Sequence, residues 1–184
     1  TPSIGLVQTS TVICSGRSVT ITLSGANTYS WNTGANFSTI IFNPTVTTNY
    51  SVIGYATNNC TNSAATSISV NTTPTVSVNS GTICAGEIFT INPSGASTYT
   101  ISGGSTTVSP VTNSVYLVSG TSTNGCIATN TPAANVFVNA LPSISVNSGS
   151  ICIGNSFTLL ANGASTYTWD SGANTSSLVV SPVA

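Results

Sequence analysis

Internal repetition constrains the fold of this chain more than any other feature of its sequence. Three segments begin with a proline in register, at Pro2, Pro74 and Pro142. Each continues into the same I-C-x-G motif, followed by a strand-like segment: VICSGRSVTITL (12–23), TICAGEIFTINP (82–93) and SICIGNSFTLLA (150–161). Self-similarity at a fixed period indicates an array of structural repeats. We therefore divide the chain into repeat 1 (1–72), repeat 2 (73–140) and repeat 3 (141–184).

Repeat 3 follows the pattern as far as a later proline, which stands at Pro44, Pro110 and Pro182 in the three repeats. Repeats 1 and 2 then continue through a Y-x-V-x-G segment and a second cysteine to a last strand, expected at SISV (67–70) and VFV (136–138). Repeat 3 lacks this part. We expect its last strands to be missing or to be supplied by another segment.

Short apolar segments of alternating polarity predict β-strands. SVTITL at 18–23 and ANVFV at 134–138 show the period of two that is typical of half-buried strands, and no segment shows the helical period. Ser, Thr, Asn and Gly are abundant, but 40% hydrophobic residues argue against disorder. About seven short strands per repeat predict an all-β fold of tandem Ig-like antiparallel β-sandwich domains, with essentially no helix.

Charged side chains are almost absent, since Arg17, Glu87 and Asp170 carry all the formal charges. So little positive charge cannot hold a nucleic acid or an anionic membrane surface. Because there is no His, no Lys and no pair of carboxylates in one repeat, we predict no enzyme, no cofactor and no metal site. No apolar run approaches the about 20 residues of a membrane span, and Thr1 in place of a Met indicates a mature segment or a fragment.

Five cysteines follow the repeat pattern, at Cys14, Cys60, Cys84, Cys126 and Cys152. The repeats favour bonds within each repeat, Cys14 to Cys60 and Cys84 to Cys126, and a partner for Cys152 about 42 to 46 residues further on, beyond the sequence. The alternative is a bond between neighbouring repeats, such as Cys14 to Cys126, because the two positions of one repeat can fall at opposite ends of a sandwich. Either arrangement implies an oxidising, extracellular compartment. A metal site is the weaker interpretation, since each repeat offers one cysteine pair at most.

Large side chains recur in pairs two residues apart, as Tyr29 with Trp31, Tyr99 with Ile101 and Tyr167 with Trp169. Such pairs lie on one face of a strand, where they could form a sugar-binding platform or part of the core. Ile101 has no ring to stack on a sugar, which favours the core. The expected core aromatics are Trp31, Trp169, Tyr50 and Tyr116.

Hydroxyl and amide side chains are candidate attachment sites for sugars, which would keep a nearly uncharged surface in solution. The candidates are Thr72, Thr73, Thr129, Thr131, Asn36 and Asn71.

The aligned pattern P-x-I-x-V, I-C-x-G-x-S-x-T-L, G-A-x-T-Y-x-W, S-P, Y-x-V-x-G, N-G-C resembles the Ig-like or PKD-like repeats of secreted Bacteroidota surface proteins. Such repeats occur in long adhesins and gliding-associated proteins that are often exported by the type IX secretion system. The resemblance covers the whole chain. It implies an extracellular, cell-surface location.

Two functions follow as expectations. The first is a structural one, in which the chain is a glycosylated segment of a surface fibre, filament or adhesin stalk whose partners are other copies of itself. The alternative is an adhesin module that binds carbohydrate or another surface. Ice binding through rows of Thr, such as TIT at 20–22, is weaker because the rows are short and interrupted.

We predict that the chain isolated from its natural source is heavier than its sequence mass of 18.4 kDa, because sugars coat the uncharged surface. Intact-mass spectrometry measures the excess. A mass equal to that of the sequence would remove the glycan hypothesis.

Overall fold

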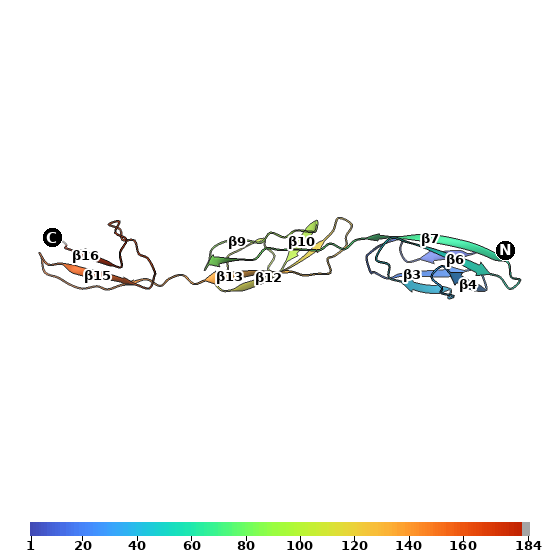
Figure 1. The fold of residues 1–184 in the computed structure, drawn as a ribbon, viewed down its shortest axis with the longest axis horizontal. Helices are drawn as coiled ribbons and strands as arrows, with labels where there is room; N and C mark the ends of the chain where they lie inside the picture. The colour runs from blue at the N-terminus through green and yellow to red at the C-terminus, as the bar shows by residue number, and fades with distance from the viewer. Residues whose placement is uncertain (182–184) are drawn as a thin grey trace. The chain divides into compact units, whose positions relative to one another are not determined.

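The computed structural model describes residues 1–181, and within them it contains β-strands and no helix (Figure 1). Pro182, the expected counterpart of Pro44 and Pro110, lies outside the described residues. No helix in this range is long and apolar enough to cross a membrane. The predicted all-β fold is confirmed.

Repeat 1 is a sandwich of two sheets. One sheet has the order β1-β3-β5 and is antiparallel, and the other has the order β2-β7-β6-β4. The strands are β1 (Gly5–Gln8), β2 (Val12–Cys14), β3 (Val19–Ser24), β4 (Thr28–Trp31), β5 (Thr39–Phe42), β6 (Thr48–Tyr55) and β7 (Thr61–Asn71). Three strands facing four is the arrangement of a small Ig-like domain.

One strand pair departs from the antiparallel expectation. β2 runs parallel to β7, with Cys14 opposite Asn71. The chain leaves β1 on one sheet at Gln8 and joins the edge of the other sheet at Val12, so that β2 continues in the direction of β1. This crossing places Cys14 beside the last residue of β7.

Alternation along the strands builds the core of repeat 1. In β3, Val19, Ile21 and Leu23 are buried while the residues between them are more exposed. They pack against residues of the facing sheet that include Trp31 and Ile68. The sandwich is therefore held by apolar burial between its two sheets.

Repeat 2 forms a four-stranded sheet of order β10-β12-β13-β8 and a two-stranded sheet β11-β9. The strands are β8 (Gly81–Cys84), β9 (Phe89–Thr90), β10 (Thr98–Ile101), β11 (Thr107–Val108), β12 (Ser114–Thr121) and β13 (Ala133–Asn139). Its core consists of Val76, Ile91, Ile101, Val118 and Ala134. A lone bridge between Ser77 and Ser94 stands where repeat 1 has the β1-β3 pair.

Repeat 3 forms one sheet, β14-β15-β16, from β14 (Ser145–Val146), β15 (Phe157–Asn162) and β16 (Ser177–Val180). This sheet corresponds to β1-β3-β5 of repeat 1. Among residues 141–181, Ala161 is the one buried hydrophobic residue. Without a second sheet, apolar side chains of this segment stay partly exposed.

The chain divides into two compact units. One contains Thr1–Gly81, Phe89–Val108 and Val115–Asn135, and the other contains Thr82–Ile88, Ser109–Ser114 and the chain from Val136 onward. This division runs through repeat 2, so the three-repeat boundaries at 1–72, 73–140 and 141–184 stay a prediction.

The glycine of the Y-x-V-x-G segment leaves room for a close approach between strands. A Cβ atom on Gly120 would lie 2.6 Å from Ala96 Cβ and 2.7 Å from Val76 Cγ2. Gly54 of repeat 1 is equally tight, at 2.8 Å from both Ala26 Cβ and Ile4 Cδ1. The segment therefore requires glycine for packing.

We predict that Gly120→Ala destabilises the protein by about 1 to 3 kcal/mol, the usual cost of overpacking. Ala96→Gly removes one clashing atom, so the double variant recovers part of that loss, which urea unfolding of the single and double variants measures. Equal losses in Gly120→Ala and in the double variant would show that close packing is not the cause.

The buried side chain of Tyr50 makes the stability of repeat 1 depend on pH in the alkaline range. Its side chain is buried and stacks on Phe42, with ring centroids 4.1 Å apart. Burial raises the pKa of Tyr50, with a hydrogen bond to Thr48 opposing the shift.

Because this pKa is higher in the folded state, the stability contribution is complete below about pH 10 and is lost as pH rises further, when the unfolded state ionises first. We expect Tyr50→Phe to reduce the fall in melting temperature above pH 10. Thermal melts between about pH 8 and 11 test this, and an unchanged alkaline fall in the variant would contradict it.

Candidate functional site

A disulfide between Cys14 of repeat 1 and Cys126 of repeat 2 is the main chemical feature of the structure. Their Cα atoms lie 5.6 Å apart, and 112 residues separate them in sequence. Cys14 ends β2 and is half-buried, whereas Cys126 is fully buried. The bond therefore links two consecutive repeats.

The last residue of β7 lies at the centre of this junction. The carbonyl of Asn71 accepts a hydrogen bond from the Ser15 amide at 2.9 Å, and the Cys126 Sγ lies 3.9 Å from the same oxygen. Repeat 2 then begins at Thr73, and its core begins at Val76. The peptide link and the disulfide thus run side by side between the two repeats.

The favoured prediction of bonds within each repeat is wrong, and the length of β7 explains why. Cys14 pairs with Asn71 at the end of β7, whereas Cys60 directly precedes Thr61 at its start. At about 3.3 Å per residue, the 11 residues of β7 hold these cysteines about 35 Å apart. A disulfide needs Cα atoms within about 7 Å, so Cys14 bonds to Cys126, the alternative that the sequence left open.

Three cysteines in the described part of the chain have no bond. Cys60 is half-buried, and Cys84 and Cys152 are exposed. Cys84 lies beside the end of β13, because the next residue, Ala85, donates to the Asn139 carbonyl at 2.9 Å. Within residues 1–181, no three His, Cys, Asp or Glu side chains gather where a metal ion could bind.

A groove of about 420 Å³ runs beside the disulfide. Repeat 1 contributes the I-C-x-G loop with Arg17, and repeat 2 contributes Thr73 and the segment that follows Cys126. The lining residues are Cys14, Ser15, Gly16, Arg17, Thr73, Gly125, Ile127, Ala128 and Thr129. Arg17 is the one charged side chain in this lining, and residues of both repeats form the groove where the disulfide joins them.

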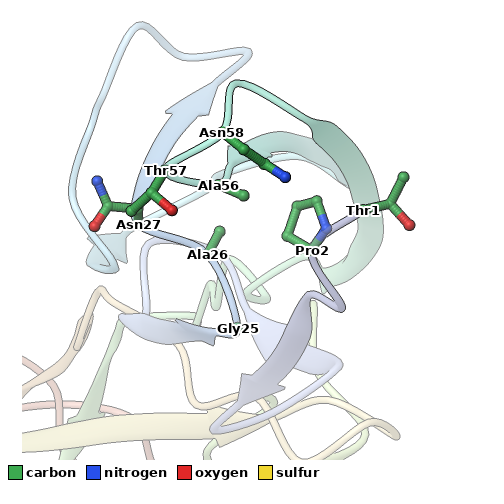
Figure 2. Close-up of a pocket in the computed structure, with 8 residues that line it drawn as sticks. All are labelled: Thr1, Pro2, Gly25, Ala26, Asn27, Ala56, Thr57 and Asn58. Atoms are coloured by element: carbon green, nitrogen blue, oxygen red, sulfur yellow. The ribbon is translucent and has the colours of Figure 1, made fainter.

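Figure 2 shows a second hollow, at the other end of repeat 1, where Thr1 and Pro2 lie opposite Thr57 and Asn58. Its lining contains no charged side chain. A similar hollow in repeat 3 is formed by the corresponding Pro142, Gly163 and Ala164. Equivalent residues therefore line a hollow in repeats 1 and 3.

The paired aromatic residues serve the structure. Trp31 and Tyr29 are 3% and 7% exposed, and Trp31 donates its indole N–H to the Phe37 carbonyl at 3.0 Å. The Tyr29 hydroxyl accepts from the Ala26 amide at 3.1 Å. Tyr99 and Tyr167 repeat this bond to the alanines three residues before them. The rings of Tyr29 and Trp31 are therefore buried in the fold and are not available to stack on a sugar.

Tyr50 lies in the core of repeat 1, as described above, while the other expected core aromatics are less covered. Tyr116 packs against the core of repeat 2 but is half-buried. Trp169 is also half-buried, although its indole N–H donates to the Thr175 carbonyl at 2.7 Å as Trp31 does in its repeat. The expected core does not close over Trp169, because repeat 3 has one sheet in the described residues.

The candidate glycan sites fall into two groups. Thr72, Thr129, Thr131 and Asn36 are exposed, and Asn71 and Thr73 are half-buried at the junction. The exposed group is accessible to an attached sugar. The sequence predicts Asn71 and Thr73 as sugar sites and does not predict that they lie where the two repeats meet. The few residues between the last strand of repeat 1 and Pro74 could have indicated this position.

No protein-family model matches the chain, and no curated protein matches its sequence. Solved structures with similar folds include three N-terminal domains of the highly immunogenic outer capsid protein (Hoc) of bacteriophage RB49, at 12% identity and a TM-score of 0.39 over 99% of this chain and 71% of that one.

A Ca²⁺-stabilised adhesin with which an Antarctic bacterium binds ice matches at 14% identity and a TM-score of 0.38, over 88% of this chain and 57% of that one. A 1.5-MDa bacterial ice-binding adhesin matches at 15% identity and a TM-score of 0.32, over 89% of this chain and 76% of that one. At such identities and TM-scores, no function passes from these proteins to the chain.

We predict that Cys14→Ser lowers the free energy of unfolding of the oxidised protein by up to about 4 to 5 kcal/mol, the chain-entropy value for a loop of this length. Cys60→Ser, which removes an unbonded thiol, is the matched control and leaves stability unchanged. Urea unfolding with and without reductant measures both. The junction assignment would be refuted if Cys60→Ser were the destabilising variant.

Proposed function

We propose that the chain is a structural repeat segment of an extracellular surface fibre, filament or adhesin stalk. The observation that carries this proposal is the Cys14–Cys126 disulfide, which bonds consecutive repeats a short distance from the peptide link between them. A bond inside one repeat would stabilise that repeat alone. A bond between repeats strengthens the array.

The bond changes the path of tension along the chain. A force applied at the two ends passes from residue 14 to residue 126 through the disulfide, so the 112-residue loop between them is not stretched. This loop contains β3 to β7 of repeat 1 and all strands of repeat 2 before β13. Most of both cores is thereby shielded from force, as a fibre or stalk requires.

Chemistry and composition support an extracellular location. A disulfide persists in an oxidising compartment, and the exposed Thr72, Thr129 and Thr131 offer sites for attached sugars. The motif resemblance to secreted Bacteroidota surface proteins supports a surface protein of that group, exported by the type IX system. We include glycosylation and this export route in the proposal.

The alternative, an adhesin module that binds carbohydrate, is supported by one observation. The half-exposed pair Tyr167 and Trp169 lines a small apolar hollow in repeat 3 with Ile144 and Val146. The equivalent Trp31 ends β4 in the four-stranded sheet of repeat 1 and is buried in the core. Residues 141–181 contain no counterpart of this sheet, which leaves the hollow open. A glycan array on the chain tests this alternative directly.

Single-molecule stretching between the two chain ends tests the structural function. We predict that reduction lengthens the fully extended chain by about 370 to 400 Å, because it releases the 112 residues of the loop at 3.3 to 3.6 Å each. The oxidised Cys60→Ser variant keeps the short length, and Cys14→Ser shows the long one. Equal lengths before and after reduction would contradict shielding.

A further inference from the structure

We propose that the groove beside the disulfide is a binding site for a small anionic thiol, which reduces the Cys14–Cys126 bond by attacking Cys14. The inference goes beyond the stalk function and does not depend on it. It rests on three observations: the unequal burial of the two bonded cysteines, the residues that line the groove, and the place of the one basic side chain.

The two cysteines of the bond differ in accessibility. Cys126 is 0% exposed, whereas Cys14 is half-buried. Among the described residues, Cys14 belongs to the lining of the groove and Cys126 does not. The rate of thiol–disulfide exchange depends on access of the attacking sulfur to the sulfur with which it bonds. A thiol in the groove therefore attacks Cys14, and Cys126 is the sulfur that leaves.

The groove has the size and the lining of a site for a small molecule. Its volume of about 420 Å³ lies in the usual range for small-molecule sites. Small side chains, among them Ser15, Thr73 and Ala128, form much of its wall. A low-molecular-weight thiol therefore fits beside the bond.

Arg17 determines which charge the groove favours. It is the one Lys or Arg in the sequence, and its exposed side chain belongs to this lining, which contains no acidic residue. The Arg17 amide donates to the Cys14 carbonyl at 3.0 Å, so the two residues share one tight turn. An anionic thiol is therefore attracted toward Cys14, and a cationic thiol is not.

Reduction proceeds in two exchange steps. The thiolate forms a bond to Cys14 Sγ, the disulfide breaks, and its electron pair leaves on Cys126 Sγ, which takes a proton from water. The new Cys126 thiol can donate to the Asn71 carbonyl, 3.9 Å from its sulfur. A second thiolate then attacks the bound thiol and releases Cys14. Two small thiols are oxidised to one disulfide, and the link between the repeats becomes reversible.

Trapping of the first step tests the site of attack. The full chain with Cys60→Ser, Cys84→Ser and Cys152→Ser prevents exchange with the unbonded thiols. This chain is treated briefly with mercaptoethanesulfonate, acidified, and alkylated with a maleimide in denaturant. We expect peptide mapping to show about tenfold more thiol adduct on Cys14 than on Cys126. Equal adducts, or more adduct on Cys126, would overturn the proposal.

Thiols of different charge test the role of Arg17. We expect Arg17→Gln to slow reduction by the anionic mercaptoethanesulfonate about threefold, the effect of attraction between unit charges a few ångströms apart in water. The rate with the cationic cysteamine stays nearly unchanged. Arg17→Lys is the matched control and keeps the original rate with both thiols, and about 0.5 M salt removes the difference. An undiminished rate of Arg17→Gln with the anionic thiol at low salt would refute the binding site.

A second pair of variants tests access through the groove. Thr129 and Thr131 are both exposed, but Thr129 lines the groove and Thr131 does not. We expect Thr129→Phe to slow reduction by the uncharged 2-mercaptoethanol about threefold or more, because the ring fills space that the thiol needs. Thr131→Phe keeps the original rate. Equal rates in the two variants would show that the thiol does not reach the bond through the groove, which also overturns the proposal.

Discussion

The length of one strand, β7, decides how this chain is cross-linked. Its 11 residues run from directly after Cys60 to the residue paired with Cys14. The two cysteines of repeat 1 are therefore held at opposite ends of the sandwich, and neither can reach the other. Because the chain passes straight from β7 into repeat 2, the turn between β12 and β13 that holds Cys126 comes within reach of Cys14. The disulfide joins repeats as a consequence of the Ig-like strand order.

Most of the fold could be predicted from the sequence, because the strands alternate clearly and the repeats confirm one another. Val19, Ile21 and Trp31 lie in the core as their period of two indicates. The cysteine pairing could not be decided in the same way. The last strand of repeat 1 was expected at 67–70, whereas β7 begins at Thr61. Its polar first half, TNSAAT, gives little sign of a strand, and it is this half that carries Cys60 away from Cys14.

In repeat 3 the local motif could be predicted from the sequence, but the burial of its tryptophan could not. Trp169 has the same local hydrogen bond as Trp31, so the local motif forms without the second sheet. Burial of the ring, however, depends on strands far along the sequence, and repeat 3 has no counterpart of β6 or β7 among residues 141–181. Local patterns therefore predict the turn and the strand, while the extent of burial depends on the complete sandwich.

The central claim is that the chain is cross-linked between repeats. Digestion of the oxidised, unreduced chain with chymotrypsin, followed by mass spectrometry of the linked peptides, tests it most directly. The structure predicts a peptide pair that contains Cys14 and Cys126. A pair that contains Cys14 and Cys60 would contradict the account, because the two ends of β7 could not then be where the sheet places them.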